Sequence, residues 1–364
     1  IGRKFANIPQ PPDGNIRGRL MEARHGAIAR LASAARDIGA AHVLLAGDSF
    51  DTATPSPTVI RQALAAMGEA TGITWWLLPG NHDNLRDAEP LWEAILRNAP
   101  PNLRPITSTE AVEIAPGVSL LPCPTAFRAS GVDPTAQLGA IATPEGHMRL
   151  ALAHGGVTDF TESGGSIAPD RDRSAGLDYL ALGDWHGRMK VSERVHYPGS
   201  PEQDRFKHNA RGVCLGVTLE AAGAAPKVQE IETGAFLWSE AALPLHSGQD
   251  PTPALGAILP ETGRRDVLLR VRASGWSGLA EQVALRQAAQ RIAPEFAHFE
   301  LETSALGTEY GATDLDEIDR AGALRLAAET LLEDAESDAL SQRDRDIAAG
   351  ALARLYAYVK EDAQ

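Results

Sequence analysis

Four short apolar stretches of the sequence each end in side chains that could bind a metal ion. The stretches are AHVLLAGD (41–48), ITWWLLPGNHD (73–83), MRLALAHGG (148–156) and LDYLALGDWHG (177–187). The polar residues at their ends are Asp48, Asn81, His82, Asp83, His154, Asp184 and His186. A glycine and an aspartate that merely begin a turn would account for the first end alone. Histidine or asparagine recurs at the other three, which indicates a shared site.

The chemistry of these residues is that of a divalent metal site. Carboxylate, amide oxygen and imidazole, with no cysteine among them, suit manganese, iron or zinc better than a structural zinc site. Two such ions about 3.5–4 Å apart can clamp a phosphate and generate a hydroxide nucleophile at neutral pH. A histidine that is not a ligand could protonate the leaving oxygen.

The surrounding pattern predicts an α/β domain over about residues 1–235. Continuously apolar runs bounded by glycine are typical of buried strands, here expected to carry helices on both faces of their sheet. Helices are predicted over 15–38, 57–70 and 86–98. The carboxyl ends of strands are where ligands collect in such sheets. The first helix should bury one apolar face, made of Leu20, Ala23, Ala27, Ile28 and Leu31.

The sequence changes in character after Trp238. Residues 241–263 are rich in proline and glycine and read as a loop-laden boundary. A strand over 264–276, a helix over 279–293 and a strand over 296–306 then predict a small β-α-β domain at 245–307. Helices should follow from Asp314, which pairs with Glu317 as a helix cap.

Two apolar stripes are predicted on the C-terminal helices. The first comprises Ile318, Ala321, Leu324, Ala328, Leu331 and Leu332, and the second, on a helix at about 344–359, comprises Ile347, Leu352, Leu355 and Val359. Packing on the parent domain and docking of a partner are both open explanations.

Composition narrows the class of protein. A length of 364 residues allows two domains, and no run approaches the roughly 20 apolar residues of a membrane helix. Two cysteines, Cys123 and Cys214, fit a reducing cytoplasm. The net charge of −14 argues against a broad basic face for nucleic acid, so any extended grip on DNA must come from a partner or a local patch.

The motifs GDSFD (47–51), GNHD (80–83), AHGG (153–156), LGDWHG (182–187) and YPGSPE (197–202) occur in the order seen in calcineurin-like metallophosphoesterases. Within that superfamily the chain is most similar to the SbcD-type DNA repair exonucleases. The resemblance is strong over about 1–235 and only in outline over 245–307. It implies a layered α/β metallophosphoesterase sandwich flanked by helices (1–240), a small α+β capping domain (245–307) and C-terminal helices (313–364).

The resemblance also assigns roles to individual residues. It implies that Asp48 bridges two metals, that Asn81 and His154 bind the second metal, and that His186 binds the first. His82 would be the catalytic histidine at the leaving group, with Asp83 supporting it. Asp51 would hold its loop rather than bind metal, and Arg188 is open between a substrate phosphate contact and a solvated surface residue.

The chain departs from the family pattern in two places. The opening Asp-x-His motif, which completes the first metal site, is missing, and we expect the native chain to extend upstream; a degenerate enzyme is the alternative. Asp184 stands where relatives usually carry a histidine of the second metal. An anionic oxygen there favours a harder ion such as manganese or magnesium. Whether Asp184 binds the metal directly or through water is left open.

The resulting expectation is a cytoplasmic DNA exonuclease or endonuclease that acts in DNA repair with two divalent ions. Manganese is the expected ion, with magnesium, iron and zinc as alternatives. By resemblance the partners are DNA, an SbcC-like coiled-coil ATPase and a second copy in a homodimer, with no membrane. The alternatives are a phosphodiesterase for nucleotides or cyclic nucleotides, and a catalytically weak scaffold.

Overall fold

The computed structural model describes residues 1–9, 14–128, 131–157, 166–309, 318 and 322–362. They divide into two compact units, Ile1–Trp238 and Ser239–Gln364. Among these residues no helix has both the length and the apolar character needed to cross a membrane.

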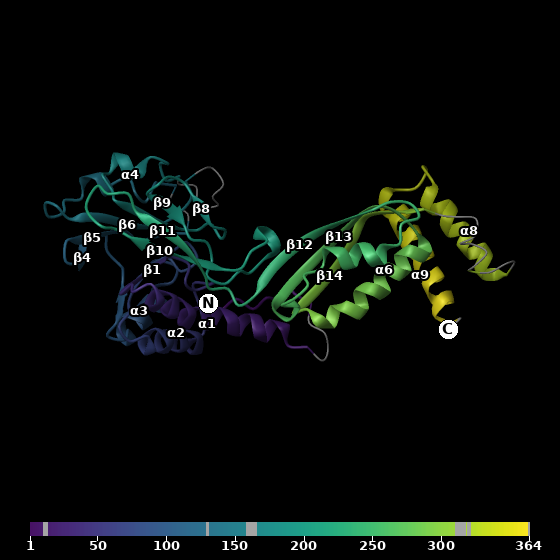
Figure 1. The fold of residues 1–364 in the computed structure, drawn as a ribbon, viewed down its shortest axis with the longest axis horizontal. Helices are drawn as coiled ribbons and strands as arrows, with labels where there is room; N and C mark the ends of the chain where they lie inside the picture. The colour runs from purple at the N-terminus through teal and green to yellow at the C-terminus, as the bar shows by residue number, and fades with distance from the viewer. Residues whose placement is uncertain (10–13, 129–130, 158–165, 310–317, 319–321, 363–364) are drawn as a thin grey trace. The chain divides into compact units, whose positions relative to one another are not determined.

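The first unit begins with a three-stranded parallel sheet and the helices that cover it. Strands β1 (His42–Ala46), β2 (Thr74–Leu78) and β3 (Leu103–Pro105) lie side by side in that order. Helices α1 (Ile16–Asp37), α2 (Pro57–Glu69) and α3 (Glu89–Asn98) gather on one face of this sheet (Figure 1). The three predicted helices are thus confirmed, and the five residues predicted for the buried face of α1 are all buried.

A six-stranded mixed sheet forms the second layer of strands. Its order is β4 (Val112–Ala115), β5 (Val118–Cys123), β6 (Met148–His154), β7 (Tyr179–Gly183), β9 (Val195–Tyr197) and β8 (Met189–Lys190). The inner strands are parallel, and the two edge strands run antiparallel to their neighbours. The short helix α4 (Arg171–Ser174) and the turns η1 (Leu138–Ala140) and η2 (Phe206–His208) belong to this unit, as does the hairpin of β10 (Val213–Thr218) and β11 (Lys227–Glu232).

The two sheets pack face to face, which corrects the expectation of helices on both faces. Trp75 and Leu77 of β2 point into the helix layer, whereas Trp76 and Leu78 join a core with Leu152 of the second sheet. The central strands β2 and β6 are therefore buried on both faces over most of their length, one face against helices or loops and one against the other sheet. The continuously apolar runs arise from this arrangement, and the layered α/β sandwich expected of the fold is confirmed.

Glycine at the strand ends allows the two sheets to approach. A Cβ added to Gly183, at the end of β7, would lie 1.8 Å from the carbonyl oxygen of Ala46 in β1. A Cβ on Gly80, after β2, would lie 2.2 Å from the Asp48 carboxylate at the end of the neighbouring strand β1. Gly183 is thus required by the close approach of the two sheets, and Gly80 by the close approach of two strand ends within one sheet.

The second unit has its own sheet, in the order β12 (Leu237–Leu245), β13 (Val267–Gly278) and β14 (His298–Glu309). Strands β13 and β14 are parallel and are joined by α6 (Leu279–Ile292), the β-α-β unit that the sequence predicts. Figure 1 shows α6 alongside these strands. The predicted loop over 241–263 is wrong in part, because it contains the end of β12 and helix α5 (Pro251–Ile258). The remaining turns are η3 (Arg264–Asp266) and η4 (Ala293–Glu295).

Helices α8 (Ala323–Glu336) and α9 (Gln342–Asp362) complete the second unit. Ala328 of α8 and Leu352 of α9 are buried with Leu279 and Ile318. Leu331, Leu332, Leu355 and Val359 of the predicted stripes pack against that cluster. Leu324 and Ile347 are exposed, so these two stripe positions do not pack on the parent domain. Asp314, Glu317 and Ala321 lie outside the described residues.

Candidate metal centre

The buried imidazole of His154 lies at the centre of the predicted site. Its Nδ1–H donates to the carbonyl oxygen of Ala46 at 2.8 Å, so β6 of one sheet is joined to β1 of the other. Its Nε2 faces three oxygens: Asn81 Oδ1 at 3.2 Å, Asp48 Oδ2 at 3.4 Å and Asp184 Oδ1 at 3.8 Å. Four strand ends from two sheets therefore deliver one donor atom each to the same point.

The charges of this cluster are mutually dependent. Burial of the His154 ring works against a positive charge, but the Asp48 carboxylate, the Ala46 carbonyl and Asp184 together raise its pKa to about 9. Burial likewise opposes ionisation of Asp48, and the hydrogen bond and charge of His154, with the backbone of His82, hold the pKa of Asp48 below its usual value. A proton or a metal ion is thus the species that balances the carboxylates here.

The donor set fits a divalent ion. Donor atoms that share one ion at about 2.0–2.2 Å lie roughly 3–4 Å from one another, and the distances from His154 Nε2 fall in that range. The bond from Nδ1 to a backbone carbonyl fixes the tautomer that offers Nε2 as a ligand. In the described part of the chain, no three His, Cys, Asp or Glu side chains converge as a fully formed metal site. The cluster is therefore a gathered set of donors that includes an amide oxygen.

Two of these donors stand on unusual backbone. Asp48 has φ +53° and Asp184 has φ +108°, both in the region that favours glycine. Such conformations cost about 1–3 kcal/mol each and persist only where surrounding contacts enforce them. At the ends of β1 and β7 they aim the two carboxylates toward His154.

Asp83 supplies the contacts that hold the Asp48 loop. Its fully buried carboxylate accepts hydrogen bonds from the backbone N–H groups of Gly80 at 2.6 Å, Phe50 at 3.1 Å and Asp48 at 3.2 Å. Burial and the negative charge of Asp48 raise the pKa of Asp83, while the N–H groups of Gly80 and Phe50 oppose that rise. Asp83 thus binds the GDSFD and GNHD loops to each other.

His82 lies on the exposed side of the same loop. Its backbone N–H donates to Asp48 Oδ1 at 2.8 Å, and its ring Nδ1–H donates to the carbonyl oxygen of Asp51 at 3.2 Å. The ring therefore offers Nε2 to a substrate. The imidazole is held directly by the Asp51 backbone, whereas Asp83 acts on the loop that carries His82. The predicted support of His82 by Asp83 stays a prediction.

His186 is held by a residue that sequence reasoning missed. Its Nδ1–H donates to Asp204 Oδ1 at 3.3 Å, and Asp204 also binds Arg3 at 3.0 Å and Arg205 at 2.9 Å. Burial opposes ionisation of Asp204, but His186 and Arg205 lower its pKa strongly. The sequence did contain a signal for Asp204, because this residue lies two positions after the YPGSPE motif.

The remaining predicted residues have structural partners. Asp51 forms an ion pair with Arg3 at 3.7 Å, consistent with a loop-holding role. Arg188 pairs with Glu230 at 2.6 Å, which favours the surface interpretation. The expected upstream Asp-x-His pair stays a prediction.

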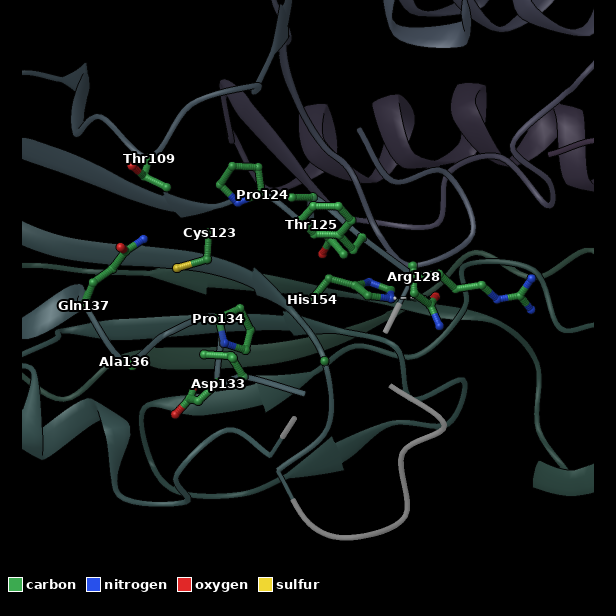
Figure 2. Close-up of a pocket in the computed structure, with 15 residues that line it drawn as sticks. Thr109, Cys123, Pro124, Thr125, Arg128, Asp133, Pro134, Ala136, Gln137 and His154 are labelled. Atoms are coloured by element: carbon green, nitrogen blue, oxygen red, sulfur yellow. Dashed lines mark hydrogen bonds between the residues drawn. The ribbon is translucent and has the colours of Figure 1, made fainter. Parts of the chain in front are cut away.

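A cavity of about 300 Å³ adjoins the cluster, and Asn81 and His154 form part of its wall. Figure 2 shows His154 and Arg128 toward one side and Gln137 and Thr109 toward the other. Two prolines, two alanines and Phe127 supply half of the remaining lining.

Asp133 in the cavity wall is fixed by charge. It binds Arg171 at 2.6 Å and accepts hydrogen bonds from the N–H and hydroxyl of Thr135. Burial opposes its ionisation, but these donors outweigh burial and lower the pKa of Asp133.

Comparison with known proteins agrees with this geometry over the first unit. None of the curated proteins compared with the chain matches it. Among solved structures, the crystal structure of TT1561 of Thermus thermophilus is 12% identical and covers 49% of this chain and 84% of its own length, with a TM-score of 0.37. That likeness is too slight to carry an argument. The family model of the calcineurin-like phosphoesterases matches residues 23–187, which contain all seven predicted site residues. Residues 23–187 are therefore similar to a calcineurin-like phosphoesterase domain, which supports the metallophosphoesterase superfamily for this part of the chain.

Proposed function

We propose that this protein is a two-metal phosphodiesterase that cleaves DNA, of the SbcD type. One observation carries the proposal: Asp48, Asn81 and Asp184 all direct an oxygen at His154 Nε2 from separate strand ends. Members of the matched family are metal-dependent hydrolases that bind two divalent ions. The gathered donors are oxygen-rich and include no thiolate, which supports manganese, with magnesium, iron and zinc as alternatives.

The proposed roles follow from where each residue lies. Asp48, Asn81, His154 and Asp184 would hold one ion, and Asp48 with His186 would contribute to the other. When bound, such ions polarise phosphoryl oxygens and lower the pKa of water.

The chain's own catalytic group is His82. Because its Nδ1–H is committed to the Asp51 carbonyl, Nε2 is the atom that can donate a proton to the departing oxygen. The backbone N–H of His82 donates to Asp48, so this general acid is held next to the residue proposed to bridge the metals. Asp83 positions both through the loop backbone.

The test measures the cleavage of two substrates, linear DNA and a small phosphodiester, by the full chain supplied with manganese. Wild type should cleave linear DNA, and His82→Ala should lose about 10²–10⁴-fold in rate, the usual contribution of general acid catalysis. His246→Ala, in the exposed turn after β12, is the matched control and should behave as wild type. Chelation should abolish cleavage of both substrates.

A small phosphodiester is the alternative substrate, favoured by the cavity of about 300 Å³ beside His154 and by the net charge of −14. Preferential cleavage of a cyclic or linear mononucleotide diester over DNA would replace the nuclease proposal with this one. Binding of DNA without any hydrolysis by wild type would support the catalytically weak scaffold instead.

The proposed partner is an SbcC-like coiled-coil ATPase, with a homodimer as a further assembly and the reducing cytoplasm as the setting. The ATPase partner is supported by apolar side chains that are exposed on the last two helices. They are Leu324 and Leu326 of α8, and Ile347 and Tyr358 of α9. Leu326→Asp with Ile347→Asp should abolish co-purification with such an ATPase and leave phosphodiesterase activity intact. Unchanged co-purification would remove these helices as the docking element.

A further inference from the structure

A lysine is held against the tryptophan of the DWH motif. The Lys207 Nζ lies 4.4 Å from the centre of the Trp185 ring, and Trp185 separates Asp184 from His186 in the sequence. The Lys207 side chain is exposed, so the face of the ammonium that is turned away from the ring is open to solvent. A cation on an aromatic face keeps its position while its other N–H groups stay available.

The segment that carries Lys207 is fixed to the site loop. The His186 carbonyl accepts hydrogen bonds from Ser200 at 2.9 Å and Gln203 at 3.4 Å. His208 packs edge-on against Trp185, with ring centres 5.9 Å apart. The position of Lys207 relative to Asp184 and His186 is therefore set by several contacts and not by one flexible side chain.

Lys207 differs in its surroundings from three basic groups that form ion pairs. Lys190 pairs with Glu193 at 2.5 Å, Lys227 pairs with Glu220, and Arg188 pairs with Glu230. Within the described ranges Lys207 takes part in no ion pair. An exposed lysine without a carboxylate beside it, in a chain of net charge −14, is a local site for an external anion.

We propose that Lys207 binds a second phosphate of an oligonucleotide strand, next to the phosphate at the metal centre. This inference rests on the proposed function and narrows its substrate class to nucleic acid strands. A small phosphodiester places its single phosphate at the metals and leaves nothing for Lys207 to bind. Lys207 is thus a binding residue that distinguishes a strand from a mononucleotide. It supplies a local positive charge for DNA in a protein whose net charge is negative.

The test measures binding, so that it does not depend on turnover. A fluorescent single-stranded oligonucleotide is titrated with the full chain, without metal, over a series of salt concentrations. Lys207→Gln keeps a methylene stem on Trp185 and removes the charge, Lys207→Arg keeps the charge, and Lys227→Gln is a control with the same charge change at an exposed, carboxylate-paired lysine.

Removing one phosphate contact should lower the slope of log affinity against log salt by about 0.7 and weaken binding about fourfold at 0.15 M salt. Lys207→Arg and Lys227→Gln should keep the wild-type slope.

Equal salt slopes for wild type and Lys207→Gln would overturn the inference, as would wild type that does not bind the oligonucleotide. An equal loss of slope in Lys227→Gln would also overturn it, because the effect would then be net charge alone. Failure of wild type to hydrolyse any phosphodiester is a separate result, and it would overturn the proposed function.

Discussion

Replacing Asp83 tests whether this residue determines the geometry of the site through the backbone. Asp83→Ala removes the acceptor of three N–H groups, those of Gly80, Phe50 and Asp48, in a place where Asp83 itself is 0% exposed. Each buried donor left unsatisfied costs about 1–3 kcal/mol, so loss of the shared acceptor of three donors should lower the free energy of unfolding by roughly 3–9 kcal/mol. Asp83→Asn retains one oxygen and turns an N–H toward a donor, and should cost about 1–3 kcal/mol.

Urea unfolding followed by tryptophan fluorescence suits this measurement, because five of the six tryptophans lie in the first unit. Asp87→Asn, at an exposed neighbour on the same loop, is the control and should stay within about 0.5 kcal/mol of wild type. The reasoning is refuted if Asp83→Ala is as stable as the control. It is also refuted if Asp83→Asn is destabilised more than Asp83→Ala.

The remaining predictions concern other parts of the same unit. Asp184→Asn should weaken manganese binding at least about tenfold by calorimetry, and an unchanged affinity would show that this oxygen does not reach the ion. Gly183→Ala should destabilise the protein by about 3 kcal/mol or more in urea, because its Cβ would overlap the Ala46 carbonyl; a loss under about 1 kcal/mol would contradict the close sheet approach. Hydrogen bonds hold the pKa of Asp133 below its usual value although burial opposes ionisation, so its stabilisation is present above about pH 4 and lost as pH falls through the lowered pKa. Asp133→Asn should therefore be less stable by about 1–3 kcal/mol at pH 7, and the gap to wild type should close in acid. Burial raises the pKa of Cys123 to about 12, so its alkylation at pH 8 should be about a thousandfold slower than that of a free thiol until the protein is unfolded.

The sequence predicts the strand ends well because each combines two independent signals. An apolar run followed by glycine marks a buried strand, and a metal-ligand side chain directly after it marks a ligand edge. Asp48, Asn81, His154 and Asp184 satisfy both signals, and the structure brings their donor atoms together.

What escaped prediction depends on contacts between distant segments. Periodicity reports that a strand is buried on both faces, but it does not say whether a helix or another sheet covers each face. Asp204 does not directly follow a strand, and its role is visible only from its hydrogen bond with His186. Helix α5 was not predicted because its two prolines suggest a loop, although both lie in its first turn and Pro251 takes the first helical position, where proline is compatible with a helix. Ile347 continues an apolar spacing, and nothing in the spacing tells how wide the buried stripe is.

The hydrogen bond from His154 to Ala46 spans 108 residues, and it has a consequence for how the chain folds. Contacts of such sequence separation form only after the entropy of closing a long loop has been overcome. No early hairpin or helix pair can assemble the donor cluster, which requires the docking of two sheets. A bound ion would then act on a late native contact, so it should lengthen the lifetime of the folded state and leave the folding rate nearly unchanged. The donor cluster therefore forms at the end of folding, and an ion bound there would oppose the first step of unfolding.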